Sequence, residues 1–340
     1  MDYGDPLALR TVQLREEYHL DDVVAGHDTE FAAQRALKRW VRSRWDHGWS
    51  LSFNTVQDAL DILHAADGGE HFNCGFYTRV FVACARALGW VARPVSIAVR
   101  DNACPRGHNV GNVGHSVPEI WSNEWRKWVI LDPDLNVHYE RDGVPLSALE
   151  IHDAWLAHEA AAVTVVREAP AFAVPTGDHV RLVAQLMPDM AHFDEAEAAH
   201  ICRRFVRHEA MDYYARLSVG RWTWLDARCL PTFISHFAPG GTGLLTSNPD
   251  DLYWTVNLVR LGATASWADG PRLQVKLEHC MPWFDHYEAR VDGGAWEPCA
   301  EGLDWPMREG ENGLEVRAVN VCGRAGITSR LQVAYAPAKW

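Results

Sequence analysis

The sequence predicts an α+β protein in which helices pack on an antiparallel sheet, followed by a β-sandwich. Three observations predict this class. Helical periodicity dominates the first part of the chain, strand-like runs follow the helix that begins at Cys74, and short strands separated by turns fill the last 90 residues. We expect two domains, 1–250 and 251–340, the first with a core at about 30–170 and a helical extension at about 178–250.

Two helices are expected before Cys74. Asp28 or Thr29 can cap the first, because an apolar face at helical spacing follows. Asn54-Thr55 is expected to open the second, with Thr55 and Asp58 as an approximate capping box. The apolar face of the first consists of Ala33, Ala36, Leu37, Trp40 and Val41.

A third helix is expected directly after Cys74. Its apolar face runs from Val80 to Leu88 at helical spacing, and Gly89 is a natural stop. That face places Cys84 in the core. Cys74 stands at the helix start instead, where the positive end of the helix dipole stabilises a thiolate. Because a glycine-containing loop precedes it, we expect an accessible sulfur.

A β-hairpin is expected to bring a histidine and a carboxylate together. After a strand at about 90–99, the strands 115–121 and 126–131 flank the dipeptide Asn123-Glu124. If that dipeptide is a two-residue turn, His115 directly faces Asp132, with Cβ atoms about 5 Å apart. Asp132 can then fix the imidazole tautomer and leave the other ring nitrogen to a thiol. A register change of one residue would place the two on opposite faces.

The later part of the chain alternates turns and short strands. A short strand is expected at 163–166, a mainly helical stretch at 178–217, and a linker at 238–250. The strands expected after the linker are 252–261, 272–279, 286–291, 314–320 and 330–335.

Composition limits the partners. A formal net charge of −13 without a basic block disfavours nucleic acid. No apolar run approaches the roughly 20 residues of a membrane span, and the N-terminus lacks a secretory pattern. We therefore expect a cytoplasmic protein that does not enter membranes, and the oligomeric state stays open. The 8 cysteines form no CxxC pair, so most are expected to be free thiols.

No metal or cofactor is predicted. HExxH is absent, and the spacing of His200 and His208 fits a solvated helix face as readily as a zinc site. His71, His108 and His138 are rivals of His115 among 17 histidines, but none has a carboxylate partner on a paired strand.

Trp121, Trp125 and Trp128 lie on the hairpin. Trp121 and Trp128 are candidate substrate-binding residues, since aromatic rings can stack on sugars or aromatic side chains. Packing in the core is the alternative.

With these residues identified, the chain resembles the transglutaminase-like superfamily of bacterial and archaeal cysteine enzymes over about residues 30–155. The resemblance implies a papain- or transglutaminase-like core with Cys74 as nucleophile, His115 as base and Asp132 as orienting residue. Pro118 departs from the family pattern and predicts an edge or bulged strand. The matching segments are Asn73-Cys74-Gly75-Phe76, residues 85–93, residues 114–121 and residues 127–133.

The last 90 residues resemble, more weakly, an immunoglobulin or fibronectin-type module. The resemblance lies in residues 317–320, followed by Gly323 and Gly326, which are similar to the penultimate strand and hairpin of such modules.

These residues favour a cysteine-dependent acyl-transfer enzyme that hydrolyses an amide or peptide bond. Transglutaminase-type transfer to an amine uses the same three residues and stays open. So do non-hydrolytic chemistry on a carbohydrate in the same cleft and an inert binding scaffold. The expected substrate is a peptide, a protein amide or a carbohydrate.

Overall fold

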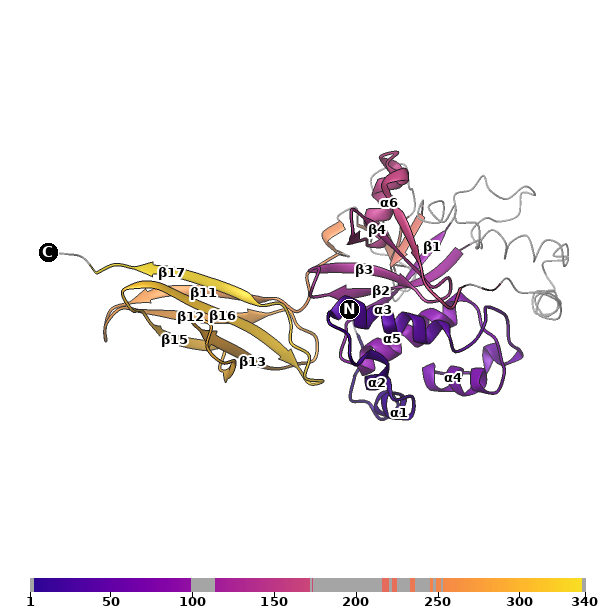
Figure 1. Ribbon diagram of the computed structural model, residues 1–340, viewed down its shortest axis with the longest axis horizontal. Helices are drawn as coiled ribbons and strands as arrows, with labels where there is room; N and C mark the ends of the chain where they lie inside the picture. The colour runs from indigo at the N-terminus through magenta and orange to yellow at the C-terminus, as the bar shows by residue number, and fades with distance from the viewer. Residues whose placement is uncertain are drawn as a thin grey trace. The chain divides into compact units, whose positions relative to one another are not determined.

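The computed structural model describes residues 3–98, 114–171, 173, 216–219, 222–224, 233–235, 245–246, 249–251 and 253–337. The chain divides into two compact units. The larger comprises Leu7–Leu88 and Ala92–Trp254, and the smaller comprises Met1–Pro6, Gly89–Val91 and Thr255–Trp340. Helices gather in the larger unit, whereas the smaller one is built from strands (Figure 1).

Most helices of the larger unit precede its first strand. Helix α5 packs against β1 and β2, and α3 and α4 pack against α5, while α3 also contacts β3 and α6 contacts β7. The helices are α1 (Leu9–Glu17), α2 (Leu20–Val24), α3 (Glu30–Arg42), α4 (Ala59–Asp67), α5 (Cys74–Ala87) and α6 (Ala148–Leu156), with 3₁₀ turns η1 (Leu51–Asn54), η3 (Ala160–Ala162) and η5 (Pro249–Asp251).

One antiparallel sheet runs through the larger unit, in the order β10-β9-β8-β7-β1-β2-β3-β4-β5, with β6 paired to β4. Strands β1 and β2 pair over seven residues in the middle of this order. The strands are β1 (Ala92–Ala98), β2 (Gly114–Ser122), β3 (Lys127–Asp132), β4 (Val137–Arg141), β5 (Val144–Pro145), β6 (Thr164–Arg167), β7 (Arg216–Val219), β8 (Trp222–Trp224), β9 (Phe233–Ser235) and β10 (Leu245–Thr246).

The N-terminal caps decide where two helices begin. Thr29 caps α3 by accepting a hydrogen bond from the Ala32 N–H at 3.2 Å, as one of the two expected caps. The second helix begins later than expected, because Asp58 rather than Thr55 is its cap and accepts from the N–H groups of Leu60 and Asp61. Residues 51–54 form η1 instead.

The helical extension expected at 178–250 lies largely outside the described residues. The described pieces of this range differ from the expectation, because β7 to β10 are short antiparallel strands that extend the sheet beyond β1. The expected linker at 238–250 contains β10 and most of η5.

Pro118 lies on an interior strand, which corrects the expectation of an edge. It is buried on β2 and directly opposes Pro94 of β1. Proline has no N–H group, so two opposed prolines cannot exchange hydrogen bonds. They form a non-hydrogen-bonded pair, a position of the ladder that needs no N–H donor between the two strands. On the β3 side the pairing begins at Glu119–Ile130, and the Ile130 N–H donates to the Leu146 carbonyl. Pro118 therefore sits where β2 and β3 stop pairing.

The smaller unit has two antiparallel sheets, of orders β11-β12-β15 and β14-β13-β16-β17. Buried side chains from both sheets form one core, including Val275, Trp305, Leu314 and Val316. Two sheets over a shared core are consistent with the expected β-sandwich. The strands are β11 (Val259–Ser266), β12 (Arg272–His279), β13 (Phe284–Val291), β14 (Glu297–Cys299), β15 (Gly302–Pro306), β16 (Gly310–Asn320) and β17 (Ser329–Tyr335).

Gly89 follows the C-terminal end of α5 and has φ +77°, the left-handed conformation that ends many helices. Its carbonyl accepts a hydrogen bond from Asn320 Nδ2 at 2.9 Å. A Cβ atom at this position would lie 2.6 Å from the Cβ of Cys322. Both the backbone conformation and the packing therefore require glycine here.

Candidate active site

Cys74 is the first residue of α5. The preceding residue, Asn73, is the N-cap, and its side chain accepts from the Gly75 N–H at 3.0 Å. Cys74 is a free, half-buried thiol, so its sulfur lies at the positive end of a 14-residue helix. Cys84, further along the same helix, is fully buried, and burial raises the pKa of its thiol. The contrast between the two cysteines follows the expectation.

His115 and Asp132 lie on β2 and β3 and are joined by a hydrogen bond. The distance from His115 Nε2 to Asp132 Oδ2 is 2.7 Å, and both side chains are almost fully buried. The other oxygen, Oδ1, accepts from the Leu135 N–H at 3.1 Å, which holds the carboxylate from behind. Asp132 thus fixes the orientation of the imidazole.

The register of the hairpin differs from the prediction by two residues. The structure pairs Trp121 with Trp128 and Glu119 with Ile130, so the loop is 123–126 rather than 123–124. A two-residue type I′ turn at Asn123-Glu124 would need positive φ at both positions, whereas in this loop the positive φ falls on Arg126, at 54°. The Glu30 carboxylate at the start of α3 also accepts from the N–H groups of residues 123 and 124.

A shift of two residues keeps every side chain on its original face, because side chains alternate with period two. His115 and Asp132 therefore still meet, but diagonally. Continued along the strand, this register would place Asp134 rather than Asp132 opposite His115. Long side chains reach diagonal neighbours readily.

The surroundings of His115 favour its imidazolium form. Burial lowers the pKa of His115, but the charge of Asp132, its hydrogen bond and the neighbouring Cys74 sulfur outweigh burial. The result is a pKa well above the ordinary value for histidine. An imidazolium next to a thiol at a helix N-terminus stabilises the thiolate.

Asp134 and His47 were missed by sequence reasoning. Asp134 is completely buried, and both of its oxygens lie near His47 Nδ1, at 2.8 and 2.9 Å. Its Oδ2 is 4.0 Å from His115 Nδ1. Donor atoms of Cys74, His115 and Asp134 all lie within 4.8 Å of one another. Asp132 and Asp134 are two residues apart, a spacing that could have predicted two carboxylates on the same face of the sheet. Nothing in the sequence singles out His47.

The rival histidines lie elsewhere. His71 Nδ1 is 3.1 Å from the carbonyl oxygen of Asp46, and His138 Nε2 is 2.9 Å from Glu140 Oε1. His108, like His200 and His208, lies outside the described residues.

Trp121 and Trp128 are buried, with 2% and 1% of their surface exposed. The indole of Trp121 donates to Asn123 Oδ1 and that of Trp128 donates to the Trp254 carbonyl. The Arg93 guanidinium lies 3.9 Å from the centre of the Trp128 ring. Packing, the alternative named for both residues, accounts for these positions.

Arg93 belongs to a buried ion pair that joins β1 to β2. Its NH2 nitrogen is 2.7 Å from Glu119 Oε2, and both side chains are almost fully buried. The other Glu119 oxygen accepts from the Ala148 N–H at 2.8 Å and from the Tyr253 hydroxyl at 3.1 Å. The carboxylate is thus satisfied on both oxygens and ties the start of α6 to the strand of His115.

A second buried ion pair lies between α3 and the residue after β6. Lys38 Nζ is 2.7 Å from Glu168 Oε2, and Arg35 and Arg39 also contact Glu168. Burial lowers the pKa of Lys38 to about 8 despite the charge of Glu168. Burial opposes ionisation of Glu168, but the hydrogen bond from Arg35 and the charge of Lys38 lower its pKa to about 2.

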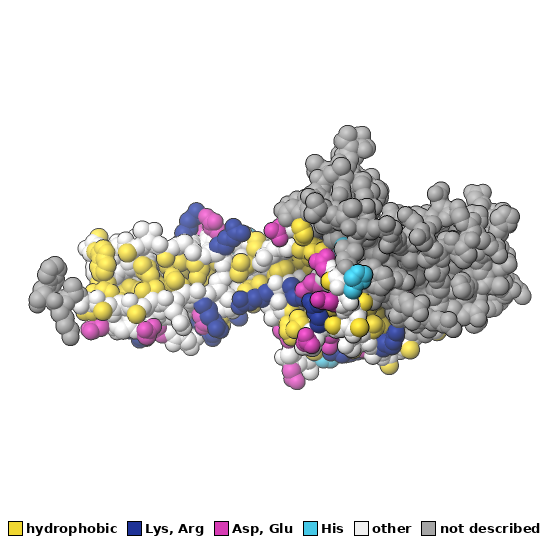
Figure 2. All heavy atoms as spheres, turned by 90° about the horizontal axis from the view of Figure 1, so that it is seen from above, with side chains coloured by type: hydrophobic (Ala, Val, Ile, Leu, Met, Phe, Trp, Pro, Cys, Tyr) yellow, Lys and Arg dark blue, Asp and Glu magenta, His cyan; other side chains and the backbone are white. Residues whose placement is uncertain are grey.

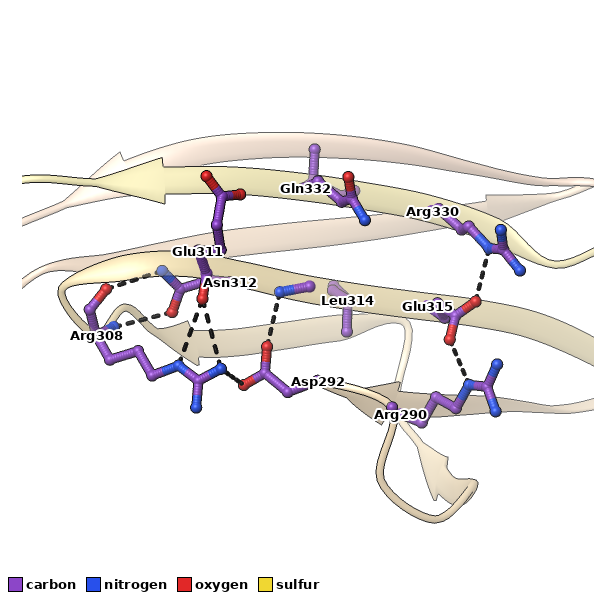
Figure 3. A pocket seen from close by; sticks show the side chains of 12 residues that line it. Arg290, Asp292, Arg308, Glu311, Asn312, Leu314, Glu315, Arg330 and Gln332 are labelled. Carbon is purple, nitrogen blue, oxygen red and sulfur yellow. Dashed lines mark hydrogen bonds and ion pairs between the residues drawn. The ribbon is translucent and has the colours of Figure 1, made fainter.

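A hollow of about 500 Å³ lies on the smaller unit, lined by residues of β13, β16, β17 and the neighbouring loops (Figure 3). Its arginines are paired internally. Glu315 bridges Arg290 and Arg330, and Asp292 pairs with Arg308 at 3.0 Å. Because these cations have carboxylate partners, the hollow offers an anion little uncompensated charge.

Basic and acidic side chains are mixed on the face drawn in Figure 2. The net charge of −13 still predicts that the protein does not bind nucleic acid. Within the described residues, no helix is long and apolar enough to cross a membrane.

Comparison with known proteins finds one family model that matches part of the larger unit. Residues 19–133 match the family model of the transglutaminase-like superfamily, and this range contains Cys74, His115 and Asp132. No curated protein sequence matches the chain.

Two solved structures are similar in part. One, described as a "putative cysteine protease" from Cytophaga hutchinsonii, has 16% identity and a TM-score of 0.29 over 48% of this chain. The chain spans about half of that protein, 50% of its length. The transglutaminase of red sea bream has 12% identity and a TM-score of 0.27, over 99% of this chain and 74% of its own.

Proposed function

We propose that this protein is a cysteine-dependent acyl-transfer enzyme, a proposal supported by the match of residues 19–133 to the transglutaminase-like superfamily. Cys74 is the nucleophile, His115 moves the proton and Asp132 orients the imidazole. The observation that carries the proposal is the convergence of a helix-tip thiol with a buried histidine–aspartate pair, in which His115 Nε2 is 2.7 Å from Asp132 Oδ2.

The reaction begins from the thiolate and imidazolium. The Cys74 thiolate attacks an amide carbonyl, forming a carbon–sulfur bond and a tetrahedral oxyanion. As the carbonyl reforms, the carbon–nitrogen bond breaks and His115 gives its proton to the leaving amine. The product is a thioester on Cys74 and a neutral imidazole, which can act as base in the second half-reaction. Asp132 stabilises the imidazolium in each half.

The Cys74 N–H is a candidate oxyanion donor. Among the described residues it has no hydrogen-bond acceptor, whereas the next two N–H groups of α5 donate to the side chain and carbonyl of Asn73. An N–H group at a helix start, beside the attacking sulfur, is suited to stabilise the negative charge that develops on the substrate oxygen.

Hydrolysis is the favoured outcome of the thioester, because water is the most abundant acceptor. We propose a peptide or protein amide as substrate. An amine in place of water would give transglutaminase-type transfer through the same intermediate.

The first test of this proposal does not depend on the substrate. Iodoacetamide should alkylate Cys74 before the other thiols, as read by mass spectrometry of the digested protein. Cys280 is the matched control, since it is exposed and lies on the smaller unit, outside the site. Preferential labelling of Cys280 at neutral pH would argue against an activated nucleophile.

The second test identifies the reaction. The purified chain is incubated with a peptide library, with and without a fluorescent primary amine, and in parallel with a glycan panel. Cleaved or deamidated peptides indicate hydrolysis, amine adducts indicate transfer, and a changed glycan indicates the carbohydrate alternative. Each activity must disappear in Cys74→Ala, and full activity in that variant would refute the acyl-enzyme. Inertness toward every substrate together with an unreactive Cys74 would favour the binding scaffold.

A further inference from the structure

Three metal-ligating side chains converge on one point beside the proposed nucleophile. Donor atoms of Cys74, His115 and Asp134 lie within 4.8 Å of one another, and His115 Nδ1 is 4.0 Å from Asp134 Oδ2. They come from the start of α5, from β2 and from the turn after β3. Asp134 has no part in the proposed triad, so this cluster is distinct from it although it shares two members.

Each nitrogen and oxygen ligand of the cluster is held by a buried partner. Asp132 engages Nε2 of His115 at 2.7 Å, which leaves Nδ1 on the side of Cys74 and Asp134. Asp134 is in turn held by His47, whose exposed fraction is 3%. Protein metal sites show this arrangement, in which a carboxylate orients the ligating imidazole and a hydrogen bond orients the ligating carboxylate.

The donor set selects the metal. One thiolate, one imidazole and one carboxylate suit a borderline-soft ion such as Zn²⁺ and are poor for Mg²⁺ or Ca²⁺, which prefer oxygen ligands alone. Ligands at normal zinc distances lie about 3.5 Å apart at tetrahedral angles. The observed separation of 4.0 Å between nitrogen and oxygen needs only a small inward movement. Three protein ligands leave a fourth position open for water.

We propose that Cys74, His115 and Asp134 form a Zn²⁺-class site whose occupation silences the nucleophile; the silencing rests on the proposed function. Binding exchanges the ion for one proton. The proton shared by the Cys74–His115 pair leaves to solvent, and the thiolate, the imidazole and the Asp134 carboxylate coordinate the ion. The sulfur lone pair needed for attack is then committed to the metal.

The binding experiment uses the full chain and Co²⁺ as a spectroscopic probe for zinc. One Co²⁺ per chain is expected, with tetrahedral d–d bands and a thiolate-to-cobalt charge-transfer band that Zn²⁺ abolishes. Cys74→Ala should remove the charge-transfer band, and Asp134→Asn should weaken binding by 10-fold or more. His47→Gln should weaken it by roughly 10–100-fold, as expected for a residue that orients a ligand.

Two variants serve as matched controls. Cys280→Ser removes an exposed thiol on the smaller unit, and His71→Gln removes a histidine that contacts the Asp46 carbonyl rather than the cluster. Both should bind Co²⁺ as the wild type does. Circular dichroism and thermal unfolding show whether each variant is folded. If Asp134→Asn is not folded, protection of Cys74 from iodoacetamide by Zn²⁺ in the wild type, reversed by a chelator, replaces it.

Wild-type affinity in Cys74→Ala, or the absence of a charge-transfer band in the wild type, would overturn the site. Thiol-dependent turnover without metal binding would overturn only this inference. If the metal binds at the cluster and turnover does not fall, the metal site stands but the claim that the metal blocks catalysis is wrong. Turnover that requires Zn²⁺ and stops with a chelator would instead overturn the proposed thiolate mechanism and retain the site.

Discussion

Asp132 accepts a hydrogen bond from His115 over 2.7 Å although the two residues are not directly opposed in the β2–β3 pair. In the observed register, continuation of the strands would place Asp134 opposite His115, and its oxygen is 4.0 Å from the other ring nitrogen. The imidazole therefore has a carboxylate on each side, one in direct contact and one just beyond it. The two carboxylates should be separable by mutation.

Replacing Asp132 by Asn should lower turnover by roughly 10²-fold or more, because the imidazole loses the partner that fixes its tautomer and stabilises its charge. The measurement is kcat on whichever amide substrate the library yields. Asp153→Asn is the control, since that side chain is 62% exposed. Equal losses in both variants would mean that Asp132 has no special role.

The raised pKa of His115 predicts a pH dependence of stability. Because the pKa is higher in the folded chain, the imidazolium contributes stability that is fully present below the ordinary histidine value of about 6.5. This contribution is lost as the pH rises through the folded-state pKa. The difference in unfolding free energy between wild type and His115→Gln should therefore shrink at alkaline pH, as measured by urea unfolding across a pH series. A difference that grows with pH would contradict this.

The ion pair of Lys38 and Glu168 predicts unequal single variants. Glu168→Gln should destabilise the fold by about 3 kcal/mol, because it leaves the completely buried Lys38 ammonium without its carboxylate. Lys38→Met should cost less, since Glu168 keeps Arg35 and Arg39. The double variant should recover part of the loss. Urea unfolding of all four proteins gives the coupling free energy between Lys38 and Glu168. If the two single losses of unfolding free energy simply add up in the double variant, the buried pair is contradicted.

Acid should act on the same pair. The pKa of Glu168 is lowered to about 2, so its contribution to stability is present above the ordinary value of 4.5 and is lost as the pH falls from there toward 2. Wild type should lose stability in this range more steeply than Glu168→Gln.

Gly89→Ala tests the packing after α5. Gly89 and Gly143 share φ +77°, but only Gly89 has a neighbour, 2.6 Å from an added Cβ. Gly143→Ala should cost about 1 kcal/mol, the strain of a left-handed alanine, and Gly89→Ala about 1–3 kcal/mol more. Thermal unfolding compares the two, and equal costs would show that the chain relaxes around Cys322.

Much of the larger unit follows from local sequence signals. Helical spacing, the Thr29 cap and the stop at Gly89 predict α3 and α5 well, because these features act within a few residues. The start of α4 was predicted too early, because Thr55 and Asp58 can both cap a helix. The 3₁₀ turn η1 occupies residues 51–54, and Asp58 is the cap.

The candidate site was harder to predict where its partners are distant in sequence. The strands of His115 and Asp132 were predictable, but the four-residue loop between them was not, and it is bonded to Glu30 from 93 residues away. His47 meets Asp134 across 87 residues, and no periodic pattern encodes such a contact. The contact of Trp128 with Arg93 was likewise not predictable, because it depends on the pairing of β1 with β2.

The register between β2 and β3 is itself a constraint on chemistry. A pairing shift of one residue would turn the acids of β3 to the opposite face of the sheet, whereas a shift of two would keep the face and change which acid lies opposite His115. A change in strand pairing alone should thus abolish or rewire the site, with every proposed catalytic residue still present in the gene.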